Sequence, residues 1–214
     1  MKRTIFFVVL LAYSLSSAAQ YEKAKQVFES PKLAEAIKTH KLVAILPFET
    51  TISFKKQPKD FNIEAHREKE KKMAASIQSS MYTFLLRKAD NYTVEFQDID
   101  KTNILIKKAK ITDSLDQMTK DQIAKVLGVD AVIYGKYETE NTKSEAGAIV
   151  TTVLFGGLGS KTGSGALTMI ISDGKSGDML WRFFKSMNDS VFISTDELID
   201  RMMRKVSRNF PYSK

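Results

Sequence analysis

The 214-residue sequence contains no cysteine, two histidines and four prolines. Without cysteine, the chain forms no disulfide, offers no thiolate to a metal or a nucleophilic reaction, and has no N-terminal cysteine to carry a lipid anchor. The two histidines, His40 and His66, lie far apart in the sequence and lack the carboxylate arrangement of a zinc-protease helix. We therefore predict no metal site, and we expect both histidines on the surface.

The spacing that phosphate-binding and hydrolase motifs require is also missing. In the glycine-rich stretch 156–165, a P-loop would need glycine at Phe155 and at Ser160, and a dinucleotide-binding loop would need its third glycine at Thr162. The chain has no Gly-x-Ser-x-Gly elbow. Four aspartates beside expected helix starts are explained by helix capping rather than by acid–base chemistry: Asp98, Asp100, Asp113 and Asp116. We predict a protein that is not an enzyme and binds no cofactor.

What is present indicates a folded, basic domain. Hydrophobic residues make up 43% of the chain and charged residues 27%, close to the average of globular proteins. The formal net charge of +8 would attract nucleic acid or an anionic membrane surface through long-range fields. It does not by itself define a site.

The first residues have the pattern of a secretory signal peptide. Lys2 and Arg3 precede an apolar run over 5–12, and Ser17 and Ala19 supply small residues for cleavage before Gln20. The alternative, a membrane anchor, would need roughly 18 to 20 apolar residues. We predict a signal peptide over residues 1–19 and export to the periplasm or outer membrane, which removes the chain from cytoplasmic nucleic acid.

Helix and strand patterns alternate along the mature chain. Apolar spacing predicts a lead-in helix within 20–40, a buried strand over 41–48, a solvated loop over 49–64 and a long helix over 64–88. A short strand over 92–96 and a helix over 98–110 follow. Thr119 and Gln122 form a capping box for a helix that Gly128 ends, and a strand over 129–137 begins directly after it.

The C-terminal part predicts a hairpin and a final helix. Strands are expected over 147–155, 166–173 and from 179 to 184, with a flexible loop over 156–165, a turn over 173–178 and a helix over 195–209. Trp181 and Phe183 should share one strand face and Arg182 and Phe184 the other, which favours core packing over an aromatic binding platform. The apolar segment 148–155 fits a buried strand or an oligomer contact better than a membrane hairpin, because neither face is polar.

These elements predict an α/β (α+β) domain over 41–214 with a mixed sheet of about five strands flanked by helices. Three motifs resemble the superfamily of CsgG and TolB N-terminal-like domains, to which LpoB is also similar. They are the strand that ends in Pro47 and Phe48, the helix-to-strand junction 123–135, and the turn 173–178 that leads to Trp181. The resemblance covers about residues 41–210.

The resemblance implies a non-enzymatic envelope protein that works as an assembly, docking or activator module. Its expected partners are other cell-envelope proteins or further copies of itself in a homo-oligomer, with no nucleic acid and with at most indirect membrane contact. The alternative that it implies is a CsgG-like oligomeric outer-membrane secretion pore. Two departures are the missing lipid-anchor cysteine and the lack of two amphipathic hairpins.

We expect the function to lie on loops mounted on a rigid scaffold. One candidate is the basic loop over 55–59 and the other is the hairpin over 147–165. The predicted interaction residues are Lys55, Lys56, Lys59, Val153, Phe155, Leu158 and Lys161.

Overall fold

A computed structural model describes residues 25–141, 162–187 and 195–214 of the chain. The strands are β1 (Lys25–Glu29), β2 (Leu42–Ile45), β3 (Glu49–Phe54), β4 (Glu95–Phe96), β5 (Ala131–Asn141), β6 (Thr162–Asp173) and β7 (Met179–Met187). The helices are α2 (Leu33–Ala36), α3 (Ile63–Leu86), α4 (Ile99–Lys108), α5 (Lys120–Leu127) and α7 (Thr195–Val206). Short 3-10 turns lie at Ala89–Asn91, Thr112–Ser114 and Ser207–Asn209.

One mixed seven-stranded sheet organises the molecule. Its strand order is β1-β7-β6-β5-β2-β4, and β3 pairs with β5 beyond the end of β2. The pairs β1–β7, β7–β6 and β6–β5 are antiparallel, whereas β2–β5, β3–β5 and β2–β4 are parallel. The prediction of a mixed sheet flanked by helices is therefore confirmed, with two more strands than expected.

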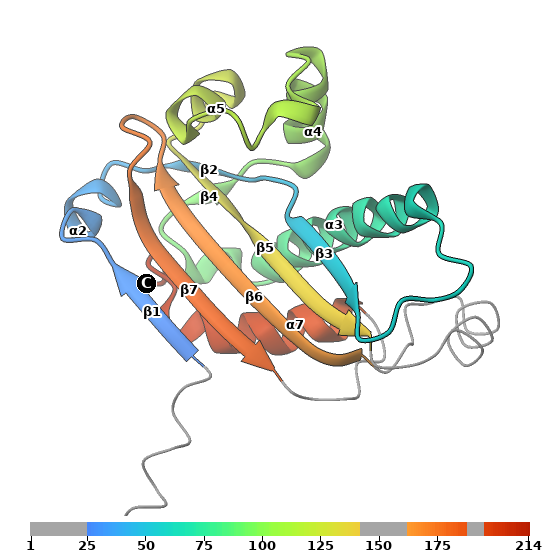
Figure 1. Cartoon of the computed structure of the whole chain (residues 1–214). Helices are drawn as coiled ribbons and strands as arrows, with labels where there is room; N and C mark the ends of the chain where they lie inside the picture. The colour runs from blue at the N-terminus through green and yellow to red at the C-terminus, as the bar shows by residue number, and fades with distance from the viewer. Residues whose placement is uncertain (1–24, 142–161, 188–194) are drawn as a thin grey trace, which may run out of the picture.

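Helices cover the two faces of the sheet unequally. The large core lies between the sheet and helices α3 and α7, which Figure 1 shows behind the strands. A smaller core lies on the opposite face, where α4 and α5 cover the region of β2 and the start of β5. None of the described helices lies in front of the face of β1, β7 and the middle of β6 that is turned toward the viewer in Figure 1.

The long helix α3 is amphipathic, as its spacing predicts. Asn62 caps its N-terminus and accepts hydrogen bonds from the amides of Glu64 and Ala65, at 2.9 and 3.0 Å. The predicted apolar stripe is buried against the sheet: Met73, Ile77, Met81, Phe84 and Leu85. The polar first turns remain largely exposed. The helix therefore packs against the sheet through its apolar face.

The junction between α5 and β5 forms as the capping box predicts. The Thr119 amide donates to Oε1 of Gln122 at 3.2 Å, and Gly128 ends the helix with φ of 66°. The carboxylate of Asp130 then accepts hydrogen bonds from the amides of Lys41 and Leu42, at 2.8 and 2.9 Å. Asp130 thus ties the start of β2 to the start of β5.

Two predictions of secondary structure were wrong, and the flexible loop expected over 156–165 is a strand from Thr162 onward. The lead-in helix expected within 20–40 is replaced over 25–29 by β1, which pairs antiparallel with β7, and only the short α2 follows. The loop expected over 49–64 begins with β3, which pairs in parallel with β5 from Glu49 to Phe54. Both strands pair with residues distant in sequence, which local spacing does not report.

Several other predictions are confirmed. Trp181 and Phe183 are fully buried on the helix side of β7, whereas Arg182 is exposed and Phe184 is half-buried on the other side. The turn 173–178 joins β6 to β7 as expected. The strand expected over 147–155 and the signal peptide expected over 1–19 lie outside the described residues. Within the described part of the chain, no helix is long and apolar enough to cross a membrane.

Candidate interaction surface

The basic loop expected to mediate binding connects β3 to α3. Lys55, Lys56 and Lys59 are all exposed. None of the ion pairs formed between described residues involves these three lysines. Their charge is therefore directed to solvent and is available to an acidic partner surface.

An aromatic cluster fixes both ends of this loop. Phe54, the last residue of β3, lies 5.9 Å from Phe61 between ring centroids, and His66 lies 5.2 and 5.1 Å from the two rings. The expectation of a surface histidine at 66 was wrong, because its side chain is only 12% exposed and Nε2 lies 3.3 Å from Oε1 of Glu70. The basic loop therefore begins and ends at aromatic side chains that pack against each other.

Glu70 also anchors β3 from its unpaired side. Its Oε1 accepts a hydrogen bond from the Ile52 amide at 2.9 Å. This bond replaces the strand partner that β3 lacks beyond β5. Strand β3, which leads into the basic loop, is therefore held by β5 on one side and by α3 on the other.

The described residues that flank the second predicted surface lie beside the first surface. Phe54 pairs with Asn141, the last residue of β5, and Asn141 pairs with Thr162, the first residue of β6. Asn141 and Thr162, which flank the segment 142–161, therefore lie beside the start of the basic loop. Four predicted interaction residues belong to that segment and lie outside the described residues: Val153, Phe155, Leu158 and Lys161.

A buried hydrogen-bonded network, which the sequence did not reveal, lies elsewhere in the fold. Nε2 of His40 is 2.9 Å from Oδ1 of Asp173, and Nδ1 is 2.8 Å from the Tyr212 hydroxyl. The expectation of a surface position for His40 was wrong, since only 5% of this residue is exposed. Its two ring nitrogens have partners from the β6–β7 turn and from the C-terminal segment.

The electrostatics of this network suit a structural clamp. Partial burial alone would raise the pKa of the Asp173 carboxyl, but hydrogen bonds from His40 and Ser176 outweigh it and leave that pKa below its usual value. Burial, with a smaller effect of nearby carboxylates, raises the pKa of the Tyr212 phenol, so the hydroxyl stays protonated. A neutral His40 can then donate to Asp173 and accept from Tyr212.

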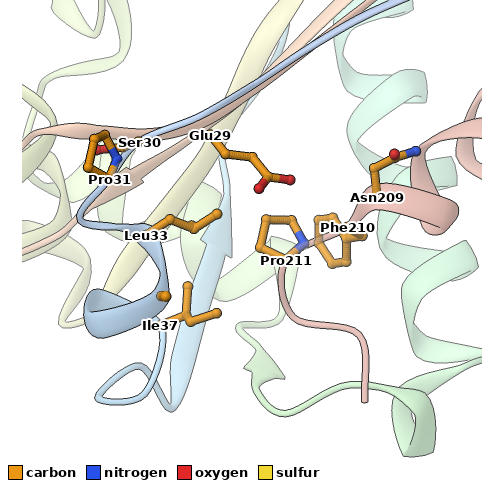
Figure 2. Close-up of a pocket in the computed structure, with 9 residues that line it drawn as sticks. Glu29, Ser30, Pro31, Leu33, Ile37, Asn209, Phe210 and Pro211 are labelled. Atoms are coloured by element: carbon orange, nitrogen blue, oxygen red, sulfur yellow. The ribbon is translucent and has the colours of Figure 1, made fainter.

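A depression of about 400 Å³ lies beside the end of β1. Figure 2 shows Leu33 and Ile37 on one side, Phe210 and Pro211 on the other, and the carboxylate of Glu29 between them. Among the described residues that line it, only Glu29 is ionisable. The depression is therefore suited to apolar contact with one acidic group rather than to acid–base chemistry.

The motifs that carry the family resemblance have structural roles. A Cβ on Gly135 would overlap the Thr168 carbonyl oxygen and lie 2.7 Å from Cε1 of Phe48. The residue that follows Pro47 thus packs over the glycine of the junction motif. Within the described ranges, no group of three or more histidines, aspartates or glutamates could hold a metal ion. At Gly135 the junction motif therefore allows the close packing of β5 against β6.

Comparison with known proteins finds similarity in structure only. No family model and no curated protein matches the chain. The PelC dodecamer from Paraburkholderia phytofirmans aligns at 12% identity and a TM-score of 0.43, over 89% of this chain and 97% of that chain. The lipoprotein GNA1162 from Neisseria meningitidis aligns at 12% and 0.39, over 79% and 98%.

The C-terminal domain of LpoB from Salmonella enterica is also similar, at 12% identity and a TM-score of 0.35, over 74% of this chain and 94% of that chain. At such identities and at TM-scores below 0.5, these similarities assign neither a family nor a function to the chain.

Proposed function

We propose that this protein is an exported, non-enzymatic module of the cell envelope that docks onto other envelope proteins. The observation that supports the proposal is that Asn141 and Thr162, the described residues on either side of the second predicted surface, pair beside Phe54, where the basic loop begins. The signal-peptide pattern over 1–19 supports export to the periplasm or outer membrane. Binding through loops on a rigid scaffold is a common arrangement.

The chemistry of the described half of this surface indicates an acidic partner. Lys55, Lys56 and Lys59 are exposed, close in sequence and outside the ion pairs between described residues. An acidic patch on a partner would gain favourable long-range attraction to this loop and would accelerate encounter. The aromatic base formed by Phe54 and Phe61 limits the entropy lost when the loop is bound.

In-cell crosslinking with a photoreactive amino acid tests the proposal. The photoreactive group would replace Lys56, and in a matched control it would replace Lys107, an exposed lysine on α4. We expect a discrete crosslinked envelope protein from position 56 and none of that mass from position 107. A charge-reversed loop, Lys55→Glu with Lys59→Glu, should reduce the crosslink about tenfold.

The control for charge is the same reversal at Lys101 and Lys108 of α4, which should leave the crosslink unchanged. Crosslinks that survive reversal of the loop would contradict docking through this surface. Release of a trapped dye from anionic vesicles by the purified protein would contradict a docking module and indicate the CsgG-like pore instead.

A further inference from the structure

Strand β1 is an outer edge of the sheet with backbone groups directed to solvent. It pairs with β7 on one side, and among the described residues no strand follows it on the other. The Ser30 amide donates to the Leu180 carbonyl at 2.8 Å, directly across the β1–β7 pair. Because hydrogen-bonded positions alternate along an antiparallel strand, residues 26 and 28 also face β7, whereas residues 25, 27 and 29 direct their N–H and C=O groups to the free edge.

The free edge is apolar at its middle. Val27 is 38% exposed and Phe28 is 47% exposed, two of the few large hydrophobic residues that the described part of the chain leaves this open. Val27 pairs with the buried Phe183 and therefore lies on the helix side of the sheet, whereas Phe28 pairs with Arg182 on the other side. A strand added at this edge would cover apolar surface on both faces.

The sequence of β1 is complementary in charge to its own antiparallel copy. The strand reads Lys25-Gln26-Val27-Phe28-Glu29. If two copies pair about a two-fold axis centred on Val27, residue 25 of each copy stands opposite residue 29 of the other. Every residue directed to the free edge then has a partner, and the register places the lysine of one copy opposite the glutamate of the other at both ends.

We propose that two copies of this chain associate through their β1 strands, antiparallel and in register about Val27, to form one continuous sheet. Directly paired residues point to the same face, so the two Val27 side chains contact each other on the helix side, and both copies carry α3 and α7 on that side. This inference goes beyond the proposed docking function, because the pair needs no other envelope protein and does not involve the basic loop.

The proposed contact is short. A pair of five-residue strands buries less area than a standard stable interface. We expect a concentration-dependent equilibrium between monomer and dimer, which sedimentation velocity over a range of protein concentrations would measure.

A single engineered cysteine tests the register, since the natural chain has none. In the proposed pair the two Val27 Cα atoms are about 5.5 Å apart, within the range of a disulfide. Val27→Cys should therefore give a reducible covalent dimer under mild oxidation. The matched control is Gln26→Cys, whose two copies would lie roughly 8 Å apart on the other face of the sheet and should remain monomeric.

A charge exchange tests the complementarity. Glu29→Lys alone and Lys25→Glu alone place like charges opposite each other at both ends, and each should weaken dimerisation about tenfold. The double variant Lys25→Glu with Glu29→Lys should restore it. A mixture of the two single variants should form a heterodimer, because each pair is then again opposite in charge.

Thermal melts of each variant by circular dichroism separate loss of pairing from loss of fold. The inference is overturned if the natural protein stays monomeric at all concentrations, if the cysteine at position 26 links as well as that at 27, or if the charge exchange restores nothing. A dimer that fails the cysteine and charge tests would show that the two copies associate through another surface, and the inference would then be wrong. Crosslinking from Lys56 reports on the docking function separately, so either proposal can fail alone.

Discussion

At the scale of single residues, the hydrogen bonds of Asp173 connect the ends of the domain. Its carboxylate binds His40, which precedes β2, and accepts the amides of Lys175 and Ser176 at 3.2 and 2.7 Å. His40 continues the connection to Tyr212 in the C-terminal segment. One buried imidazole thus holds three distant parts of the chain together, and the ionised form of Asp173 is the form that the fold stabilises.

This arrangement predicts how stability responds to acid. The pKa of the Asp173 carboxyl is lower in the folded state than in the unfolded state. The stabilisation is therefore fully present above the unfolded value of about 3.9 and is lost as pH falls through the folded pKa. Asp173→Asn should lower the free energy of unfolding at pH 7, and its difference from the natural protein should shrink below about pH 4.

Urea unfolding followed by circular dichroism from pH 7 to pH 3 would measure this difference. The matched control is Asp113→Asn in an exposed 3-10 turn, for which we expect a small and nearly constant effect. A difference for Asp173→Asn that does not change with pH would show that the carboxylate charge is unimportant in this network.

At the scale of helices and strands, the sequence predicts elements with a local pattern and misses those defined by distant partners. The stripe of α3, the capping box at Thr119 and the alternation at Trp181 and Phe183 repeat within one element, and the structure confirms each of them. The apolar residues Tyr21, Ala24, Val27 and Phe28 recur in the sequence at a spacing that fits a helix, and the last two belong to β1. Only its pairing with β7, which follows more than 150 positions later, makes it a strand.

The same distinction between local pattern and distant partners applies to the candidate site. The exposure of Lys55, Lys56 and Lys59 follows from their local polarity and is found in the structure. The burial of His40 was not predictable, because its partners lie 133 and 172 positions away and no neighbouring residue indicates them. Histidine is about as common at the surface as inside, so composition does not decide its position.

The packing of β2, β5 and β6 predicts that two glycines of the junction motif differ in sensitivity. A methyl group on Gly135 would overlap the Thr168 carbonyl oxygen on β6, a backbone atom that cannot move alone. We expect Gly135→Ala to reduce the free energy of unfolding by about 3 kcal/mol. At Gly128 nothing lies within 4 Å, and alanine should lose about 1 kcal/mol through its left-handed backbone alone.

Denaturant unfolding of both variants would measure the two losses under the same conditions. Equal losses would contradict the close contact between β5 and β6 at Gly135. A larger loss at Gly128 would contradict it as well.

At the scale of the whole molecule, the helices bury one face of the sheet more completely than the other. α3 and α7 enclose the core on one side, whereas in Figure 1 no helix from the described ranges lies in front of the other side of β1 and β7. Residues on the less covered side are a mixture of apolar, polar and charged types: Phe28, Ala166, Thr168, Ile170, Arg182 and Phe184. The stability of the domain therefore depends mainly on the helix side of the sheet.

Adjacent phenylalanines on β7 test this asymmetry, because they have the same side chain on opposite faces. Phe183 is fully buried and stacks on Trp181 with ring centroids 5.9 Å apart, so Phe183→Ala should reduce the free energy of unfolding by about 3 to 5 kcal/mol. Phe184 is half-buried on the open side, and Phe184→Ala should lose about 1 kcal/mol. Chemical denaturation of the two variants measures both losses. Similar losses would mean that the open face is covered in solution, in which case sedimentation of Phe184→Ala would show whether a second copy supplies the cover.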